Sequence, residues 1–116
     1  MNIEGIRAAY RQALGEFEPI AIRRYTGKGA NRPWFDWLCT ARVVDYTPDQ
    51  LVGPIQQGDR KLIVLAQDLV DAQFPGPIVK NDKAVVRGKE LNIEAVDDNT
   101  RRVGTVLIAY ELRVRG

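Results

Sequence analysis

The sequence predicts a mainly β protein, a small antiparallel β-barrel or sandwich with a short N-terminal amphipathic helix. Apolar residues recur at helical spacing only near the N-terminus. Beyond residue 19 they form short runs, several of them alternating, separated by Gly, Pro, Asn and Asp. A chain of 116 residues has room for one hydrophobic core. We therefore expect residues 1–116 to form a single domain.

The helix is predicted from the first apolar residues, whose spacings of three and four place them on one face. These residues are Ile3, Ile6, Tyr10, Leu14 and Phe17. We expect Asn2 to cap the start of the helix. Gly15 and Pro19 are expected to end it, because Gly accepts a left-handed backbone and Pro cannot continue the helical hydrogen bonds.

Two strands joined by a loop are predicted next. Alternating and β-branched residues over 20–25 favour a first strand. Several glycines, Asn31 and Pro33 interrupt regular structure over 26–36, so we expect an exposed loop there. Apolar residues return over 37–46 and predict the second strand.

The middle of the chain carries signals for a helical turn, a third strand and an irregular connection. Thr47 can cap a helical turn that has Pro48 in its first position. The apolar run 62–66 is too short for an ordinary helix and favours a buried strand. Residues 68–73 fit neither period, and the two prolines within 74–77 predict irregular backbone.

The last third of the chain predicts a hairpin followed by a final strand. Residues 84–87 and 91–95 flank a turn at 88–89, and the second of these runs alternates as expected for a strand with one solvated face. A polar loop is expected over 97–104. Apolar residues then alternate over 106–114, which predicts the last strand.

Composition argues against nucleic-acid-binding and membrane proteins. The chain has 17 Lys and Arg against 15 Asp and Glu, and a net charge of +2 is too small for a dedicated nucleic-acid or membrane-surface binder. No apolar run approaches the roughly 20 residues that span a bilayer, and the N-terminus lacks a secretory pattern. We expect synthesis in the cytosol and no membrane partner. The single cysteine, Cys39, is expected to be a buried apolar residue.

Residue types used in catalysis are sparse. The sequence has no His, the commonest general base and metal ligand, and it has no CxxC pair and no P-loop. Three acidic pairs remain: Asp45 with Asp49, Asp68 with Asp71, and Asp97 with Asp98. Such pairs could bind a hard cation or act as acid and base, but Asp also favours turns, which is the role we expect. The prediction is a protein that is not an enzyme, with no catalytic residue, no metal site and no cofactor.

Cations and aromatic rings gather between residues 23 and 37. This mixture is typical of the centres of protein interfaces, where Trp, Tyr and Arg are enriched. Burial in the core and a module that stacks single-stranded nucleic acid are the alternatives for the same residues. The candidate interface residues are Arg24, Tyr25, Lys28, Arg32, Trp34, Phe35, Trp37, Phe74, Arg101 and Arg102.

Three segments resemble a known family. Residues 80–97 place an Asp before a strand, a Gly-containing turn and an alternating strand that ends at Val96-Asp97. Residues 106–115 form a final strand with Tyr and Arg, and residues 57–62 supply a matching Gly-Asp turn and strand. This pattern resembles the small neck proteins of tailed bacteriophages, the head-closure or head–tail joining family.

The resemblance implies a non-enzymatic virion structural protein with a small β-barrel. Such a protein, often monomeric alone, assembles with other copies of itself into a ring beneath the portal, where DNA passes through the lumen and the tail docks below. Its partners would be the portal or adaptor protein and tail proteins, and its location would be the virion neck, after assembly in the host cytoplasm. The loops 26–36 and 66–79 are expected to make the contacts.

Overall fold

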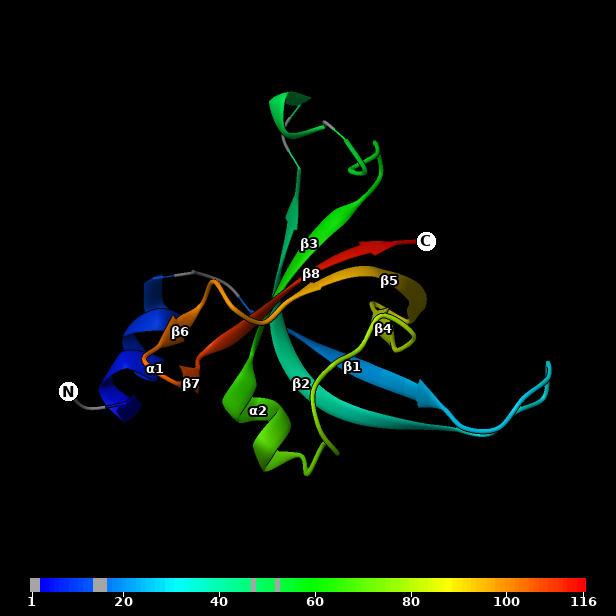
Figure 1. The fold of residues 1–116 in the computed structure, drawn as a ribbon, viewed down its shortest axis with the longest axis horizontal. Coiled ribbons are helices and arrows are strands. Elements are labelled where there is room, and N and C mark those ends of the chain that lie inside the picture. The colour runs from blue at the N-terminus through cyan, green and yellow to red at the C-terminus, as the bar shows by residue number, and fades with distance from the viewer. Residues whose placement is uncertain (1–2, 14–16, 47, 52) are drawn as a thin grey trace.

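The computed structural model describes residues 3–13, 17–46, 48–51 and 53–116. Within them, six antiparallel strands close into a barrel in the order β1-β2-β3-β8-β5-β4, and β4 pairs back onto β1 (Figure 1). This confirms the mainly β prediction and selects the barrel over the sandwich. The elements are α1 (Ile3–Ala13), β1 (Glu18–Tyr25), β2 (Trp34–Asp45), η1 (Pro48–Gln50), β3 (Arg60–Leu65), α2 (Ala66–Asp71), β4 (Lys83–Val86), β5 (Lys89–Asp97), β6 (Arg102–Val103), β7 (Val106–Leu107) and β8 (Ala109–Arg115).

Inward-facing side chains of the strands fill the barrel. Alternation along each strand sends every second residue to the interior, where apolar side chains from different strands meet. The large side chains with almost no exposed surface include Ile22, Leu62, Val64, Val86, Ile93, Leu112 and Val114. Burying each of them stabilises the fold by roughly 1.5–3 kcal/mol. The barrel is therefore a packed core.

The N-terminal helix α1 is present, but the predicted helix extended too far. Phe17 lies beyond α1, just before β1, and packs against Ile63, Leu65 and Ala109 on the outside of the barrel. Its spacing from the earlier apolar residues therefore reflects contact with strands rather than a place on the helix. The expected caps and stops at Asn2 and Gly15, and Leu14 of the apolar stripe, lie outside the described residues.

The hairpin of β1 and β2 is longer than the sequence predicted. The expected loop over 26–36 is wrong in its last three residues, because β2 already begins at Trp34. Tyr25 pairs with Trp34 and Arg23 pairs with Asp36 in the antiparallel register. Cross-strand contacts thus continue the ladder through a stretch whose local sequence signals a loop.

Other boundaries shift by smaller amounts. The ambiguous residues 68–73 lie largely in α2, which also takes Ala66 from the predicted third strand. The β4–β5 turn is centred on Arg87 and Gly88, both with positive φ (52° and 78°), the geometry that suits the twist of a two-residue hairpin. The predicted turn was one residue too late. The helical turn after β2 is confirmed as η1, and Thr47 lies outside the described residues.

The end of the chain also differs from the prediction. The expected polar loop 97–104 contains β6, which pairs with β7 in a separate two-stranded sheet near α1 (Figure 1). The final strand accordingly begins at Ala109 instead of residue 106. In this position β8 pairs with both β3 and β5.

Asp59 holds the connection between β2 and β3, residues 46–59, against the barrel. Its side chain is buried and accepts hydrogen bonds from Nε and Nη2 of Arg115 at 2.7 and 2.9 Å and from the backbone N–H of Gln56 at 3.0 Å. Arg115 Nη2 also donates to the carbonyl of Pro54 at 3.3 Å. The Arg115 guanidinium lowers the pKa of Asp59 below its ordinary value, despite the opposing effect of burial.

Stability is expected to fall in acid, partly through Asp59. A carboxylate with a lowered folded-state pKa stabilises fully above its unfolded pKa of about 3.9, and this contribution is lost as the pH falls through the folded pKa. Asp59→Asn should lose about 2 kcal/mol of unfolding free energy at pH 7 and depend less on pH below about 4. Urea denaturation at a series of pH values from neutral to acid measures how the unfolding free energy of the wild type and of the variant depends on pH. Glu90 and Asp97, whose pKa values are also lowered, supply the dependence that the variant keeps, and identical slopes would contradict the assignment.

Candidate protein-interaction site

Residues 23–37 form a hairpin that projects beyond the barrel, and we call it the hairpin arm. β4 pairs with β1 only over 20–23, so Arg24 and Tyr25 have β2 as their sole partner strand among the described residues. Figure 1 shows the arm reaching away from the barrel to a tip formed by residues 26–33.

The inner face of the arm continues the barrel core. Trp37 lies opposite Ile22 in the ladder, and its ring meets Phe74 edge to face with centroids 5.0 Å apart. Phe35 lies further out, with its ring 6.2 Å from that of Trp37. The guanidinium of Arg24 lies over the Phe74 ring at 4.7 Å. These contacts tie the arm to the connection between α2 and β4.

A buried ion pair holds Arg24 in that position. Asp82 is only 1% exposed and accepts hydrogen bonds from Nε and Nη2 of Arg24, each at 2.8 Å. Arg24 also donates to the carbonyls of Pro75 and Pro77, while Asp82 accepts the backbone N–H of Val79 at 3.0 Å. Every charge of this pair is therefore compensated, and the hydrogen bond to Asp82 raises the pKa of Arg24.

The outer face of the arm is a network of cations, rings and carboxylates. Arg23 donates to both oxygens of Asp36 at 2.8 and 3.0 Å and to Glu90 at 3.0 Å, and its guanidinium lies over the Trp34 ring. The hydroxyl of Tyr25 donates to Glu90 and, with Arg23, lowers the pKa of that carboxyl. The cation of Arg23 is thus already neutralised within the chain.

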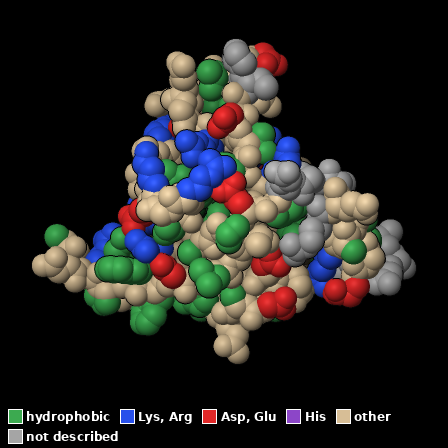
Figure 2. Space-filling view, turned by 180° about the vertical axis from the view of Figure 1, so that it is seen from behind, with side chains coloured by type: hydrophobic (Ala, Val, Ile, Leu, Met, Phe, Trp, Pro, Cys, Tyr) green, Lys and Arg blue, Asp and Glu red, His purple; other side chains and the backbone are tan. Residues whose placement is uncertain are grey.

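Three large apolar side chains of β2 stay exposed, two on the outer face beside this network and Phe35 on the inner face. Trp34, Phe35 and Leu38 are 51%, 58% and 75% exposed. Figure 2 shows hydrophobic side chains gathered on the face of the molecule from which the arm projects. Exposed apolar surface of this kind marks interaction sites in soluble proteins.

The structure brings together most of the candidate residues and leaves two apart. Those that meet are Arg24, Tyr25, Arg32, Trp34, Phe35, Trp37 and Phe74, with the Arg32 guanidinium 4.5 Å from the Tyr25 ring centre, while Lys28 lies on the same arm at its exposed tip. Arg101 and Arg102 lie at the opposite end of the molecule, by β6 and β7 (Figure 1). There Arg101 donates to Glu111 at 2.9 Å, and Arg102 donates to backbone carbonyls.

Sequence reasoning missed Leu38, Asp36 and Asp82. Alternation counted from Trp34 would have placed Asp36 and Leu38 on the same face as that ring, but the expected loop concealed the strand. The partnership of Arg24 with Asp82 joins residues 58 positions apart, and no local pattern signals it.

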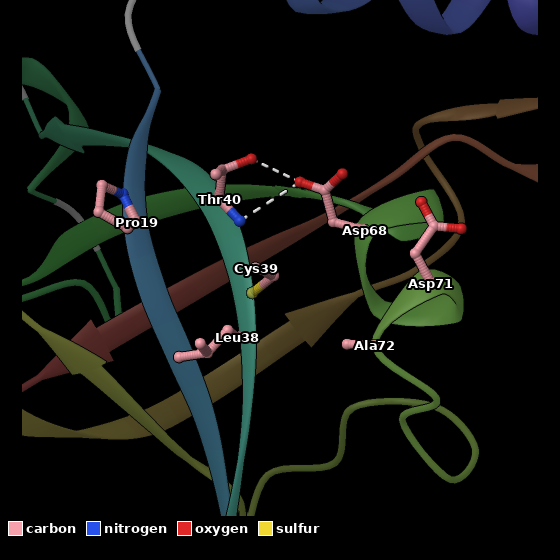
Figure 3. A pocket seen from close by; sticks show the side chains of 7 residues that line it. All are labelled: Pro19, Leu38, Cys39, Thr40, Asp68, Asp71 and Ala72. Carbon is pink, nitrogen blue, oxygen red and sulfur yellow. Dashed lines mark hydrogen bonds between the residues drawn. The ribbon is translucent and has the colours of Figure 1, made fainter.

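A shallow hollow of about 470 Å³ lies between β2 and α2 (Figure 3). It contains one of the predicted acidic pairs, Asp68 and Asp71. Figure 3 shows Asp68 pointing at Thr40, whose backbone N–H and hydroxyl both donate to it. Cys39 also lines the hollow, is buried as expected, and burial raises the pKa of its thiol to about 12.

In the acidic pair at 97–98, the side chain of Asp97 stabilises the turn after β5. Asp97 accepts the backbone N–H groups of Asn99 and Thr100 and the Thr100 hydroxyl, which together lower its pKa. Among the described residues there is no cluster of three potential metal ligands. No helix among the residues that the structure describes is long and apolar enough to cross a bilayer. Comparison with protein-family models, curated proteins and solved structures finds no match to this chain.

Removing Arg24 should damage the arm and the fold together. Arg24→Met keeps the length of the side chain but leaves the Asp82 carboxylate buried without its cation, so we expect a loss of about 3 kcal/mol in unfolding free energy. Lys28→Met likewise removes a cation, here from the exposed tip, and should change stability by less than about 0.5 kcal/mol. Chemical denaturation compares the two variants, and equal effects would show that the pair with Asp82 is not what anchors the arm.

Proposed function

We propose that this chain is a non-enzymatic structural protein of the tailed-phage neck, a subunit of a ring that joins the head to the tail. In this proposal the hairpin arm contacts other copies, the portal or adaptor protein, or tail proteins, and DNA passes through the lumen of the ring. The resemblance of residues 57–62, 80–97 and 106–115 to neck proteins motivates the assignment.

The observation that carries the proposal is the form of the arm. Trp34 and Phe35 are more than half exposed, yet they stand on a two-stranded ladder that is fixed to the barrel by Arg24, Trp37 and Phe74. Preorganised aromatic side chains lose little conformational entropy on binding, and such residues dominate protein interfaces. A packed barrel with a projecting apolar arm fits a protein that works by binding its neighbours.

The same geometry makes nucleic-acid binding the less favoured function. Affinity for nucleic acid comes mainly from cations that are available to neutralise phosphates. Within the arm, Arg23 is bound to Asp36 and Glu90, and Arg24 is bound to Asp82. Binding of single-stranded DNA that weakens steeply with salt would favour the nucleic-acid alternative over the neck proposal.

The location of the protein tests the proposal directly. Immunogold electron microscopy with antibody against this chain, on particles from the source culture, should place the label at the head–tail junction. Particles disrupted between head and tail should keep label at the broken end. Absence of label from intact and disrupted particles alike would reject the neck assignment.

Loss of the exposed rings should block assembly without unfolding the chain. Trp34→Ala with Phe35→Ala removes two rings of the proposed contact surface, so we expect infectious particles to fall by at least about tenfold. Gln56→Ala with Gln57→Ala, which truncates two exposed side chains outside both the arm and the segment 66–79, is the control and should leave the titre unchanged. Circular dichroism verifies folding of both variants. A normal titre from the arm variant would contradict the assigned role of the arm.

A further inference from the structure

One edge of β2 has no partner strand within the hairpin arm. β2 pairs with β1 over 34–41 and with β3 over 41–45. Between 34 and 40 the edge that faces away from β1 therefore meets no strand in the part of the chain that is described (Figure 1). The inner end of this edge is closed, because the backbone N–H of Thr40 donates to Asp68 of α2 at 3.3 Å.

The backbone groups along the open edge belong to Trp34, Asp36 and Leu38. The carbonyl of Pro33 accepts a hydrogen bond from the N–H of Thr26 across the hairpin, so odd-numbered residues of β2 face β1 and even-numbered residues face away. Among the described residues, the N–H and C=O groups of these three even-numbered residues have no backbone partner on the open edge. An unpaired, exposed edge is a template for a further strand.

The usual protections of an edge strand are missing here. Natural edges are commonly guarded by Lys, Pro or an unpaired charge, and residues 34–38 contain no Lys and no Pro. The one charge in this segment, Asp36, is bound by both Nε and Nη2 of Arg23. The edge thus presents unpaired backbone groups and exposed apolar side chains, and its one carboxylate is paired with Arg23.

We propose that two copies of this chain pair through this edge, antiparallel, about a two-fold axis at Asp36. In this register Trp34 of one copy lies opposite Leu38 of the other on the outer face. On the inner face Phe35 of one copy lies opposite Trp37 of the other. Each large apolar side chain of the edge gains an apolar partner, and the contact closes after two copies.

Charge and register select this arrangement. The two Asp36 carboxylates meet at the axis, and each is bound by its own Arg23, so neither carboxylate enters the contact without a cation. A shift by two residues would place Asp36 opposite Leu38 and Trp34 opposite Thr40, whose N–H is already bound to α2. A shift by one would turn the backbone groups of one copy away from those of the other.

The pairing goes beyond the neck function, because it concerns the free chain in solution. It stands even if the protein acts elsewhere, and a location at the neck would not establish it. The two proposals therefore fail separately.

Sedimentation equilibrium of the full chain over a range of concentrations tests the pairing. We expect a reversible dimer, and Leu38→Lys should raise its dissociation constant at least about tenfold, because it removes a large apolar side chain from the contact and Lys on an edge strand opposes pairing with a further strand. Val70→Lys makes the same change at a side chain of α2 that is 66% exposed, and it should leave the dimer unchanged. A monomer at every soluble concentration, or equal effects of the two variants, would overturn the proposal.

A crosslink tests the register. Asp36→Cys places two thiols opposite each other at the axis with their Cα atoms about 5.5 Å apart, within the range of a disulfide. Oxidation should yield a covalent dimer from this variant and none from Lys28→Cys at the tip. Wild-type chain should also stay uncrosslinked, because Cys39 is buried. A dimer in solution that Asp36→Cys fails to crosslink would reject the edge contact.

Discussion

Barrel closure by β1 is the constraint on which the rest of the structure depends. β1 pairs with β2 over its whole length, but with β4 only over residues 20–23. The first part of the strand therefore closes the barrel, and the last part leaves it with β2 as its only partner strand in the described chain. The change occurs where the buried Ile22 gives way to Arg24. One continuous strand thus provides both a packed core and a projecting arm.

The arm holds its shape because the charges of Arg23 and Arg24 are satisfied inside the chain. Burying Asp82 would be costly alone, since a desolvated carboxylate needs a cation and hydrogen bonds. Arg24 supplies the cation, stacks on Phe74 and donates to two carbonyls of the irregular connection. On the other face of the arm, Arg23 pairs with Asp36 and Glu90 and lies over the Trp34 ring. What remains for a partner is apolar side chains, backbone and the cations of Lys28 and Arg32 towards the tip.

Elements with strong periodicity were predictable from the sequence, and those set by distant contacts were not. Alternation over 20–25 and 106–114 located the first and last strands of the barrel, although the latter starts later than predicted. The glycines and prolines before Trp34 signalled a loop, but cross-strand pairing extended β2 through part of it. An uninterrupted alternation of apolar and polar residues was enough to predict a strand. Where glycines and prolines interrupted it, contacts between strands decided the structure.

The candidate site followed the same rule. Residue types typical of interfaces identified the arm. Aromatic residues are few in this chain, and residues 23–37 place several of them among cationic residues. The two arginines at 101–102 share that chemistry but lie at the other end of the molecule, because the hairpin of β6 and β7 carries them there. Which cations remain available to a partner depends on Asp36, Asp82 and Glu90, and their pairing is a property of the fold alone.

The placement of β8 has a consequence for how the protein is made. β8 is the last barrel strand in chain order, yet it lies between β3 and β5 and pairs with both. The ribosome synthesises the N-terminal strands first, so β1, β2 and β3 can pair as a local meander. The edges of β3 and β5 that pair with β8 stay without this partner until β8 has been synthesised. The barrel therefore closes late. Until then the nascent chain exposes apolar surface and unpaired strand edges, to which chaperones can bind and through which the chain can aggregate.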